Sequence, residues 1–325
     1  MPFEVEDCGQ ARPRDGAIVI ALLNNMPDAA LEATEGQFGS LLAAAAGTLP
    51  VRLRHVWLPE VPRGPQALER LNRRYFSIDA LYAEPPDGLI VTGMEPRAAT
   101  LQEEPYWNRM VQVLEWAQTH TASSIWSCLA AHVAADALRG VRRRRLPEKC
   151  FGVFEHRVVS DHALLRGVGP VLPTPHSRWN ELPLDQLQAA GFEIMSLSGE
   201  TGADLFVCPG ESPLICFQGH PEYDELALLK EYRRDVGRYL RAEMAGWPNL
   251  PQGYFSAAGV ATLAKYRARA EQARDPEQLS NFPLAELAAG IRPHWQPVGV
   301  TIYRNWLTHL ATMRASSASA RSFQR

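Results

Sequence analysis

A single cysteine, Cys128, stands where the pattern of the sequence changes period. The stretch that opens at Ser123 is β-prone, and Leu129 to Gly140 carries alanine-rich, helix-forming residues. This change is typical of a strand–nucleophile–helix elbow, which aims one side chain at a helix N-terminus. The helix dipole there favours a thiolate, and free backbone N–H groups can hold a developing oxyanion. The alternative is that Cys128 is a small buried residue at a strand end, as most free cysteines are.

A histidine suited to act as the base follows a second apolar segment. His220 comes after Leu214 to Gln218 and a glycine, so we expect it at the carboxyl end of a strand. Glu222 is two residues further on and can hold the imidazole and stabilise its charged form. Together with Cys128 these residues match the nucleophile, base and orienting carboxylate of covalent acyl chemistry. A lone histidine is more often structural, but a Gly-His-Pro-Glu run paired with a cysteine elbow is a more specific signal.

The surrounding segments predict a parallel sheet. Apolar runs read as strands at 17–23, 51–58, 88–93 and 123–127, and helical spacing follows at 29–46, 106–119 and 129–140. Because the strands are apolar throughout rather than alternating, we expect helices on both faces of the sheet. Sites in such sheets lie at the carboxyl ends of the strands. The turns at Asn24, Gly93 and Cys128 are therefore expected to converge on one crevice.

The second half of the chain is less regular. Strands are expected at 151–159 and 192–196, a hairpin-like pair at 204–208 and 214–218, and a long helix at 225–245. We divide the chain into an irregular lead-in (1–15), one α/β domain (16–256), a helical insertion with a closing helix of the same domain (257–313) and a disordered tail (314–325). The tail is small and polar in composition, which favours disorder.

Composition limits the classes of function. The 325 residues are 46% hydrophobic and 21% charged, as in an ordinary globular enzyme. A net charge of −3 gives no reason to expect nucleic acid or a membrane surface as a partner. The N-terminus shows no signal-peptide pattern and no apolar run is long enough to span a membrane, so a cytoplasmic location is expected.

The cysteines and the arginines add two further expectations. Five cysteines without CxxC spacing indicate neither a disulfide framework nor a zinc site, so no metal is expected and a reducing compartment fits. The run of four arginines at 142–145 is interpreted as a solvated loop. Contact with ligand phosphates and contact with another subunit are the alternatives.

Several further stretches carry a resemblance to a known family. They are Leu22–Pro27, Asp87–Gly93, Tyr106-Trp107, Glu148–His156, Pro175–Arg178, Gly219–Asp224 and Asn305–Leu307. On these residues the chain resembles the homoserine O-acyltransferases of the transsuccinylase type, from about Ile18 to Leu307. The resemblance implies an α/β, parallel-sheet three-layer sandwich of the class I glutamine amidotransferase-like (flavodoxin-like) type, with a C-terminal helical extension.

The resemblance also implies a reaction. A succinyl or acetyl group would pass from acyl-CoA to the hydroxyl of L-homoserine in methionine biosynthesis, by a ping-pong route through an acyl-cysteine. In this resemblance Cys128 falls at the position of the family's acyl-accepting nucleophile, His220 at that of its general base and Glu222 at that of the carboxylate behind the histidine. Acyl-CoA is then a co-substrate, no cofactor is needed, and the partners are small-molecule substrates, with a homodimer left open.

The family resemblance places three more residues at the substrates. Lys149, Ser177 and Arg234 fall where the family has groups around the acyl chain and the amino acid. A guanidinium suits the carboxylate of homoserine. The alternatives are an ordinary exposed lysine for Lys149, and turn residues with a surface ion pair for Ser177 and Arg178.

The chain also departs from the family pattern. Leu129 follows the nucleophile where the family usually has tryptophan, and the segment between Phe255 and Asn305 is longer than usual. Counted without gaps from Gly93, Arg97 falls at the position where the family has Glu or Gly, the residue that separates enzymes using acetyl-CoA from those using succinyl-CoA. Its guanidinium could pair with the free carboxylate of succinyl-CoA, contact the CoA phosphates or lie on the surface. We expect succinyl-CoA as the donor.

Other functions remain open at this stage. A glutamine amidotransferase-like cysteine hydrolase would expect glycines around the nucleophile, whereas Ser127 and Leu129 flank Cys128. A related acyltransferase could use another hydroxy-amino acid as acceptor. A binding protein that has lost activity is the non-enzyme alternative, and the intact Cys128, His220 and Glu222 speak against it.

Overall fold

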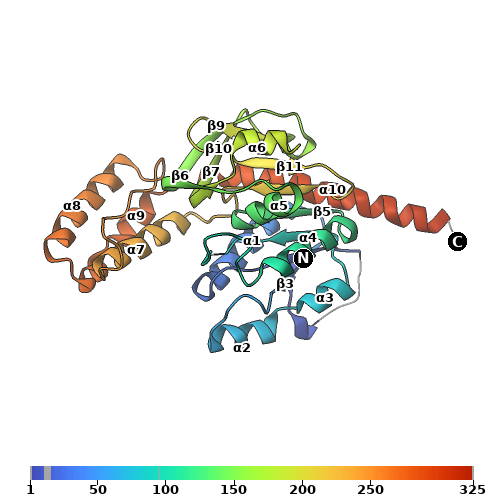
Figure 1. The fold of residues 1–325 in the computed structure, drawn as a ribbon, viewed down its shortest axis with the longest axis horizontal. Helices are drawn as coiled ribbons and strands as arrows, with labels where there is room; N and C mark the ends of the chain where they lie inside the picture. The colour runs from blue at the N-terminus through green and yellow to red at the C-terminus, as the bar shows by residue number, and fades with distance from the viewer. Residues whose placement is uncertain (1, 11–15, 95, 324–325) are drawn as a thin grey trace.

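The computed structural model describes residues 2–10, 16–94 and 96–323, with side chains described as far as residue 316. An eight-stranded sheet forms its centre, in the order β1-β3-β2-β4-β5-β12-β11-β8 (Figure 1). The strands are β1 (Phe3–Glu6), β2 (Ile18–Leu23), β3 (Val51–Val56), β4 (Gly88–Val91), β5 (Ser123–Ser127), β8 (Glu193–Ile194), β11 (Leu205–Cys208) and β12 (Leu214–Phe217). The pairs from β1 to β12 are parallel, and β11 pairs antiparallel with both neighbours. The predicted parallel sheet and the predicted hairpin are therefore confirmed.

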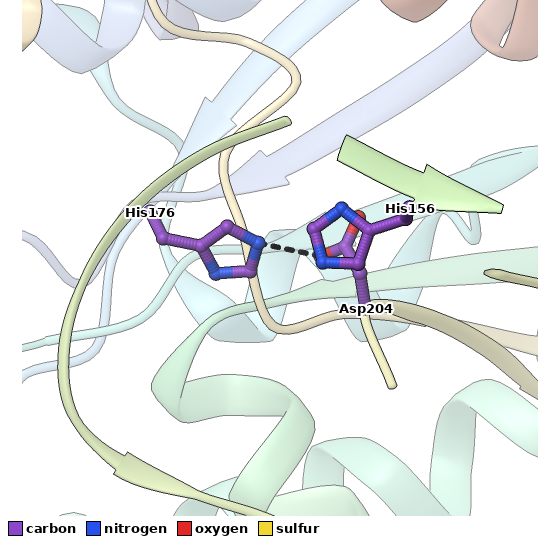
Figure 2. A group of neighbouring side chains, drawn as sticks. All are labelled: His156, His176 and Asp204. Carbon is purple, nitrogen blue, oxygen red and sulfur yellow. Dashed lines mark ion pairs between the residues drawn. The ribbon is translucent and has the colours of Figure 1, made fainter. Parts of the chain in front are cut away.

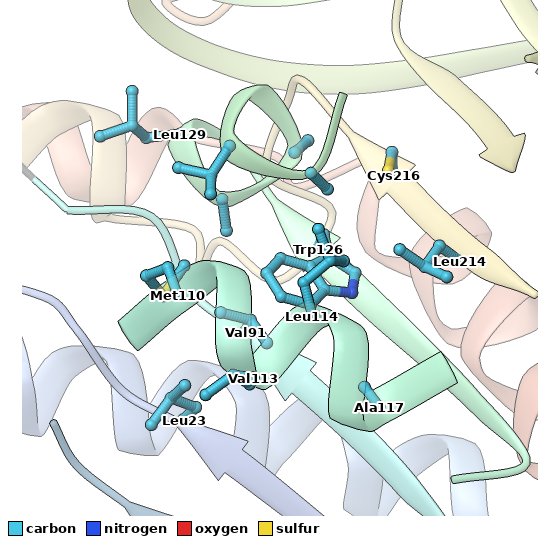
Figure 3. Packing of buried hydrophobic residues seen from close by; sticks show 14 of the residues in the cluster. Leu23, Val91, Met110, Val113, Leu114, Ala117, Trp126, Leu129, Leu214 and Cys216 are labelled. Carbon is cyan, nitrogen blue, oxygen red and sulfur yellow. The ribbon is translucent and has the colours of Figure 1, made fainter. Parts of the chain in front are cut away.

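Helices cover both faces of the sheet, as the continuous apolar strands require. One face packs against α3 (Ile78–Ala83), α4 (Trp107–His120), α5 (Leu129–Arg139) and α6 (Leu184–Ala189). Figure 3 shows Leu114 of α4 lying over Trp126 of β5, which is fully buried. The opposite face packs against α1 (Leu31–Ala46) and α10 (Gln296–Phe323). These layers make the α/β sandwich that was expected.

The N-terminal residues differ from the expected irregular lead-in. Residues 3–6 form β1, an edge strand parallel to β3. Four residues with the pattern Phe-Glu-Val-Glu give too short an alternation to indicate a strand. The strand is held by ion pairs, with Glu4 2.8 Å from Arg52 and Glu6 2.7 Å from Arg54. Residues 11–15 of the lead-in lie outside the described residues.

A second sheet, which the sequence analysis did not predict, lies beside the first. It is antiparallel, in the order β10-β9-β6-β7, and consists of β6 (Arg144–Val158), β7 (Val171–Glu181), β9 (Ser196–Ser198) and β10 (Gly202–Ala203). Ser177 and Arg178 therefore lie in a strand and not in a turn. Two prolines, Pro173 and Pro175, obscure the strand pattern in the sequence, and they are tolerated because β7 is an edge strand.

The last two of the four consecutive arginines also belong to this sheet. Arg144 and Arg145 open β6, so the expected loop covers only the first part of the run. Arg144 pairs with Glu181 of β7, and the guanidinium of Arg145 lies 4.7 Å from the centre of the Trp179 ring. Strand pairing and these contacts order a segment whose charge alone indicates a solvated loop.

The remaining helices form a smaller layer and the connections. The helices α7 (Ala227–Leu240), α8 (Ala257–Ala273) and α9 (Leu284–Gly290) pack together beyond the sheet edge (Figure 1). Helix α2 (Pro65–Arg74) packs beside α1, and short 3₁₀ turns occur at η1 (Cys8–Gln10), η2 (Asp28–Ala30), η3 (Ala163–Leu165) and η4 (Pro276–Asn281). Within the described part, no helix has both the length and the apolar character that crossing a bilayer requires.

The C-terminal helix is longer than expected. We expected it to end near Met313 and to be followed by a disordered tail from 314, but α10 continues to Phe323. Three alanines and two arginines in 314–323 favour a helix, although the four serines of the same segment do not. Arg314 anchors this part by an ion pair of 2.9 Å with Asp87. Residues 324 and 325 lie outside the described residues.

Candidate active site

Cys128 occupies the elbow between β5 and α5. Its backbone has φ 53° and ψ −115°, a conformation that costs energy for any residue other than glycine. The N–H of Cys128 donates to the carbonyl of Phe217 at the end of β12, at 2.7 Å. This bond ties the elbow to the neighbouring strand, and the half-buried side chain lies at the start of the helix. The predicted strand–turn–helix elbow at Cys128 is confirmed, and the role of Cys128 as a nucleophile stays a prediction.

Gly93, two residues after the end of β4, lies close against the elbow. A Cβ atom at this position would lie 3.0 Å from the amide nitrogen of Leu129 and 3.4 Å from Cβ of Cys128. The N–H of Leu129 is in the first turn of α5 and has no acceptor within the helix. It is therefore suited to bind a negative oxygen formed on a substrate at Cys128. The predicted convergence of strand ends holds for Gly93 and Cys128.

His220 and Glu222 complete the arrangement at the elbow. Nδ1 of His220 lies 2.8 Å from Oε1 of Glu222, and the sulfur of Cys128 is near enough to the imidazole to raise its pKa. Because a carboxylate only accepts, Nδ1 carries the proton and Nε2 is left for the sulfur. The hydroxyl of Ser127 makes a longer contact of 3.4 Å with the same carboxylate oxygen. The three predicted catalytic residues are therefore brought together.

The electrostatic environment favours a charged imidazole. Burial by itself lowers the pKa of His220, but the carboxylate of Glu222 and then the sulfur of Cys128 raise it well above its ordinary value. Both His220 and Glu222 are more than nine-tenths buried, so their attraction is weakly screened by water. An imidazolium beside Cys128 stabilises a thiolate, which is the reactive form of the nucleophile.

A second cluster forms around Glu231 of α7. Its carboxylate accepts hydrogen bonds from the hydroxyls of Ser177 and Tyr223, the latter at 2.6 Å. The ammonium of Lys149 lies 3.5 Å from Oε2 of Glu231, and the guanidinium of Arg234 lies 3.7 Å from the same oxygen. Lys149, Ser177 and Arg234, which the family resemblance placed at the substrates, thus meet at one carboxylate.

Asp235 balances the remaining charge of this cluster. Its carboxylate lies 3.1 Å from Nζ of Lys149 and 3.0 Å from the guanidinium of Arg234. Burial raises the pKa of Asp235, but these two cations lower it by more than burial raises it. The pKa of Asp235 is therefore below its ordinary value. Lys149 is only 13% exposed in its side chain and lies over the ring of Phe151. It is not the ordinary exposed lysine that was the alternative.

Tyr223 joins the two clusters. Its ring stacks on His220, with ring centres 4.3 Å apart and planes inclined by 16°. Its hydroxyl reaches Glu231, so one side chain contacts both the imidazole and the carboxylate. Burial, and then the charge of Glu231, raise the pKa of Tyr223 well above its usual range, so the phenol stays a donor.

Arg97 lies apart from these two clusters. The residue is exposed, and its backbone N–H donates to the buried Glu104 at 2.6 Å. Arg143 fixes the same loop from the other side by donating to the carbonyl of Ala99 at 3.2 Å. The loop follows Gly93 and therefore borders the elbow, but no described contact joins the guanidinium of Arg97 to Cys128 or Glu231. Its role at the substrates stays a prediction.

Three residues of the site, Glu231, Asp235 and Tyr223, were not predicted from the sequence. Glu231 was not singled out, although it lies three residues before Arg234 and four before Asp235, on the same face of a helix. Tyr223 belonged to the Gly-His-Pro-Glu-Tyr run, but its contact with Glu231 depends on how α7 follows the loop. The helical spacing was a signal that could have identified Glu231.

Comparison with known proteins gives one consistent result. Residues 8–316 match the family model described as homoserine O-succinyltransferase. A homoserine O-succinyltransferase of Rhodopseudomonas palustris is 46% identical over 96% of this chain and 94% of its own length. Another, from Bradyrhizobium japonicum, is 41% identical over 93% of each chain. Among solved structures, a glutamine amido transferase from Methylobacillus flagellatus has a similar fold, with a TM-score of 0.51, 16% identity, and coverage of 90% of this chain and 95% of that one.

Proposed function

The chain belongs to the homoserine O-succinyltransferase family of acyltransferases, and we propose that it moves a succinyl group from succinyl-CoA to the hydroxyl of L-homoserine through an acyl-cysteine. The observation that carries this mechanism is the elbow at Cys128, beside a His220 imidazole that is hydrogen-bonded to Glu222 and whose pKa the sulfur of Cys128 raises. The product, an activated ester of a hydroxy-amino acid, suits a later substitution at the same carbon. This agrees with a place in methionine biosynthesis.

In the first half-reaction the thiolate of Cys128 attacks the thioester carbonyl of succinyl-CoA. A new carbon–sulfur bond forms while the bond to the CoA sulfur breaks, and the charged His220 gives its proton to the departing CoA thiolate. The oxygen of the tetrahedral intermediate accepts a hydrogen bond from the N–H of Leu129 in the space that Gly93 leaves open.

In the second half-reaction the neutral His220 takes the proton of the homoserine hydroxyl. The oxygen attacks the acyl carbon, the ester forms, and Cys128 leaves as a thiolate beside the newly charged imidazole. Glu222 keeps Nδ1 protonated and directs Nε2 at the reacting atoms in both steps. Thioester exchange is nearly balanced in energy, which suits an acyl-cysteine intermediate between the CoA donor and the homoserine acceptor.

The cluster at Glu231 supplies the acceptor site. Two cations, Lys149 and Arg234, and two anions, Glu231 and Asp235, lie within ion-pair distance of one another. A zwitterion is the ligand that such a balanced set suits, because its ammonium replaces a cation at Glu231 and its carboxylate pairs with a guanidinium. Homoserine is a zwitterion at neutral pH, and the stacked Tyr223 places this cluster next to His220.

Intact-mass spectrometry tests the proposal. The protein is mixed with succinyl-CoA in the absence of homoserine, and we expect a mass increase of one succinyl group located on Cys128 by peptide mapping. Addition of homoserine should remove the adduct and release O-succinylhomoserine. The Cys128→Ser variant is the control, and it should lose transfer while keeping its circular dichroism and melting temperature. Normal turnover in that variant, or an adduct at another residue, would contradict the mechanism.

A further inference from the structure

A buried polar group lies beside the active site and takes no part in the proposed reaction steps. It consists of His156 of β6, His176 of β7 and Asp204, which precedes β11, and all three are fully buried (Figure 2). One potential ligand atom from each residue lies within 4.8 Å of the others. In the described part of the chain, Nδ1 of His156, Nε2 of His176 and Oδ2 of Asp204 have no hydrogen-bond partner. Buried polar atoms without partners need an explanation.

Two histidines and a carboxylate form a donor set known from transition-metal sites. Arg178 argues against a cation here. Its Nε donates to Nδ1 of His176 at 3.2 Å, so Nδ1 is the acceptor and Nε2 carries the proton. A metal-bound histidine has the reverse arrangement, with the lone pair on the metal and an N–H donated to an acceptor. Arg178 is itself buried, and its contact with His176 already places one positive charge beside this group.

One water molecule would satisfy all three atoms. It accepts the proton of Nε2 of His176 and donates to Oδ2 of Asp204 and to Nδ1 of His156. The other nitrogen of His156 is already paired with the hydroxyl of Thr201, at 2.8 Å. Nε2 of His176 lies 3.5 Å from the other oxygen of Asp204, Oδ1, which is too long for a good hydrogen bond, and Oδ1 already accepts the N–H of Gly219. Burial and then the charge of Arg178 keep the pKa of His176 well below its usual range, so its ring is neutral.

This group holds the chain segment that carries the base. Oδ1 of Asp204 accepts the N–H of Gly219 at 2.8 Å, and the carbonyl of Pro175 accepts the N–H of His220 at 2.8 Å. The approach is close, because a Cβ on Gly219 would lie 2.9 Å from Oδ1 of Asp204 and 2.8 Å from the carbonyl oxygen of Pro175. Only glycine fits there without displacing the segment.

Strand β7 links this group to both parts of the active site. Side chains alternate along a strand, so His176 points toward Asp204 while Ser177 points to the cluster at Glu231. We propose that His176 and Asp204, bridged by one buried water, position the Gly219–His220 segment for acyl transfer. The inference rests on the proposed function in one respect, that His220 is the base.

The test uses the rate at which iodoacetamide alkylates Cys128 at pH 7 in the full-length protein. His176→Phe removes both hydrogen-bonding nitrogens, and we expect the alkylation rate and kcat to fall roughly ten- to hundredfold, with KM for both substrates unchanged. His176→Gln keeps a donor near the position of Nε2 and should lose less. Gly219→Ala leaves the buried histidines in place but displaces the segment, so it should resemble His176→Phe.

Two controls make the outcome decisive. His55→Phe replaces another buried histidine, in β3, whose nitrogens also lack partners among the described residues. Iodoacetamide should alkylate Cys128 in this variant at the wild-type rate. His220→Ala sets the rate without the base. Wild-type alkylation in His176→Phe and Gly219→Ala, with a slow His220→Ala, would overturn the positioning role alone. A wild-type rate in His220→Ala would instead overturn the base assignment in the proposed function.

The occupant is tested separately. The purified enzyme is dialysed against zinc chloride and then against metal-free buffer, and bound metal is measured by elemental analysis. We expect no bound zinc. In a crystal structure we expect an electron-density peak for a water at hydrogen-bond distances of about 2.7–3.0 Å from the three atoms. Zinc retained in a one-to-one ratio by the wild type and lost in His176→Gln would overturn the water bridge.

Discussion

The hydroxyl of Tyr223 donates to Oε1 of Glu231 at 2.6 Å, while its ring lies 4.3 Å from the centre of the His220 ring. The proposed base and the carboxylate of the proposed acceptor site therefore contact the same side chain. Movement of either group changes the contact of the other with Tyr223. This relationship explains why the segment after His220 leads directly into α7, the helix that carries Glu231 and Arg234.

Tyr223→Phe removes the hydrogen bond but keeps the stacked ring. We expect KM for homoserine to rise about tenfold, because a hydrogen bond to a charged group contributes roughly 1.5–3 kcal/mol, and kcat to change little. Tyr223→Ala should also lower kcat, since His220 loses the ring against which it packs. Steady-state kinetics with homoserine as the varied substrate measures both. If the two variants behave alike, the hydroxyl and the ring do not have separate roles.

Glu222→Gln tests the charge behind the base. The carboxylate is the largest cause that raises the pKa of His220, so its removal lowers that pKa. The charged imidazole needed to protonate CoA is then lost at lower pH, and the basic limb of kcat/KM for succinyl-CoA should move down by about 1–3 pH units. A pH–rate profile measures the shift. The His220→Ala variant should show no such limb, and its rate should fall roughly 10²–10⁴-fold. A lower rate in Glu222→Gln than in His220→Ala would mean that the two roles are reversed.

Glu231→Gln and Arg234→Ala test the acceptor site. Each removes one charge that the zwitterion is proposed to contact, so we expect KM for homoserine to rise roughly tenfold or more. KM for succinyl-CoA should stay within about twofold, because neither charge is proposed to contact that donor. Lys230→Ala is the matched control, since Lys230 precedes Glu231 on the same helix and is an exposed cation paired with Asp224. Equal effects of all three variants on both substrates would contradict an acceptor site here.

Arg97→Gly tests the donor preference. The sequence argument predicts that the guanidinium favours succinyl-CoA over acetyl-CoA. Because Arg97 is exposed, water screens its charge, and the expected rise in KM for succinyl-CoA is a few-fold and not the ten- to hundredfold of a buried contact. Kinetics with both donors measures the difference. An equal loss with both donors indicates contact with the CoA phosphates, and no change with either places Arg97 on the surface without a role.

The catalytic centre was predictable because its signals are local. Cys128 stands where a strand pattern changes to a helix pattern, and the Gly-His-Pro-Glu run follows an apolar strand. Both lie at the carboxyl ends of parallel strands, and parallel strands place these ends at one edge of the sheet. The β5–β12 pairing then brings the cysteine and the histidine together. The triad therefore follows from strand order alone.

Only the tertiary structure decided the surroundings of that centre. Strand β1 was missed because four residues hold too little pattern, and its ion pairs join residues 48 positions apart. Strand β7 was hidden by its prolines, yet it supplies Ser177 to Glu231 and His176 to Asp204. No sequence periodicity states which buried donor meets which acceptor across two sheets. The sequence by itself predicted Cys128 and His220 as nucleophile and base and determined the parallel sheet, and long-range packing determined the groups around them.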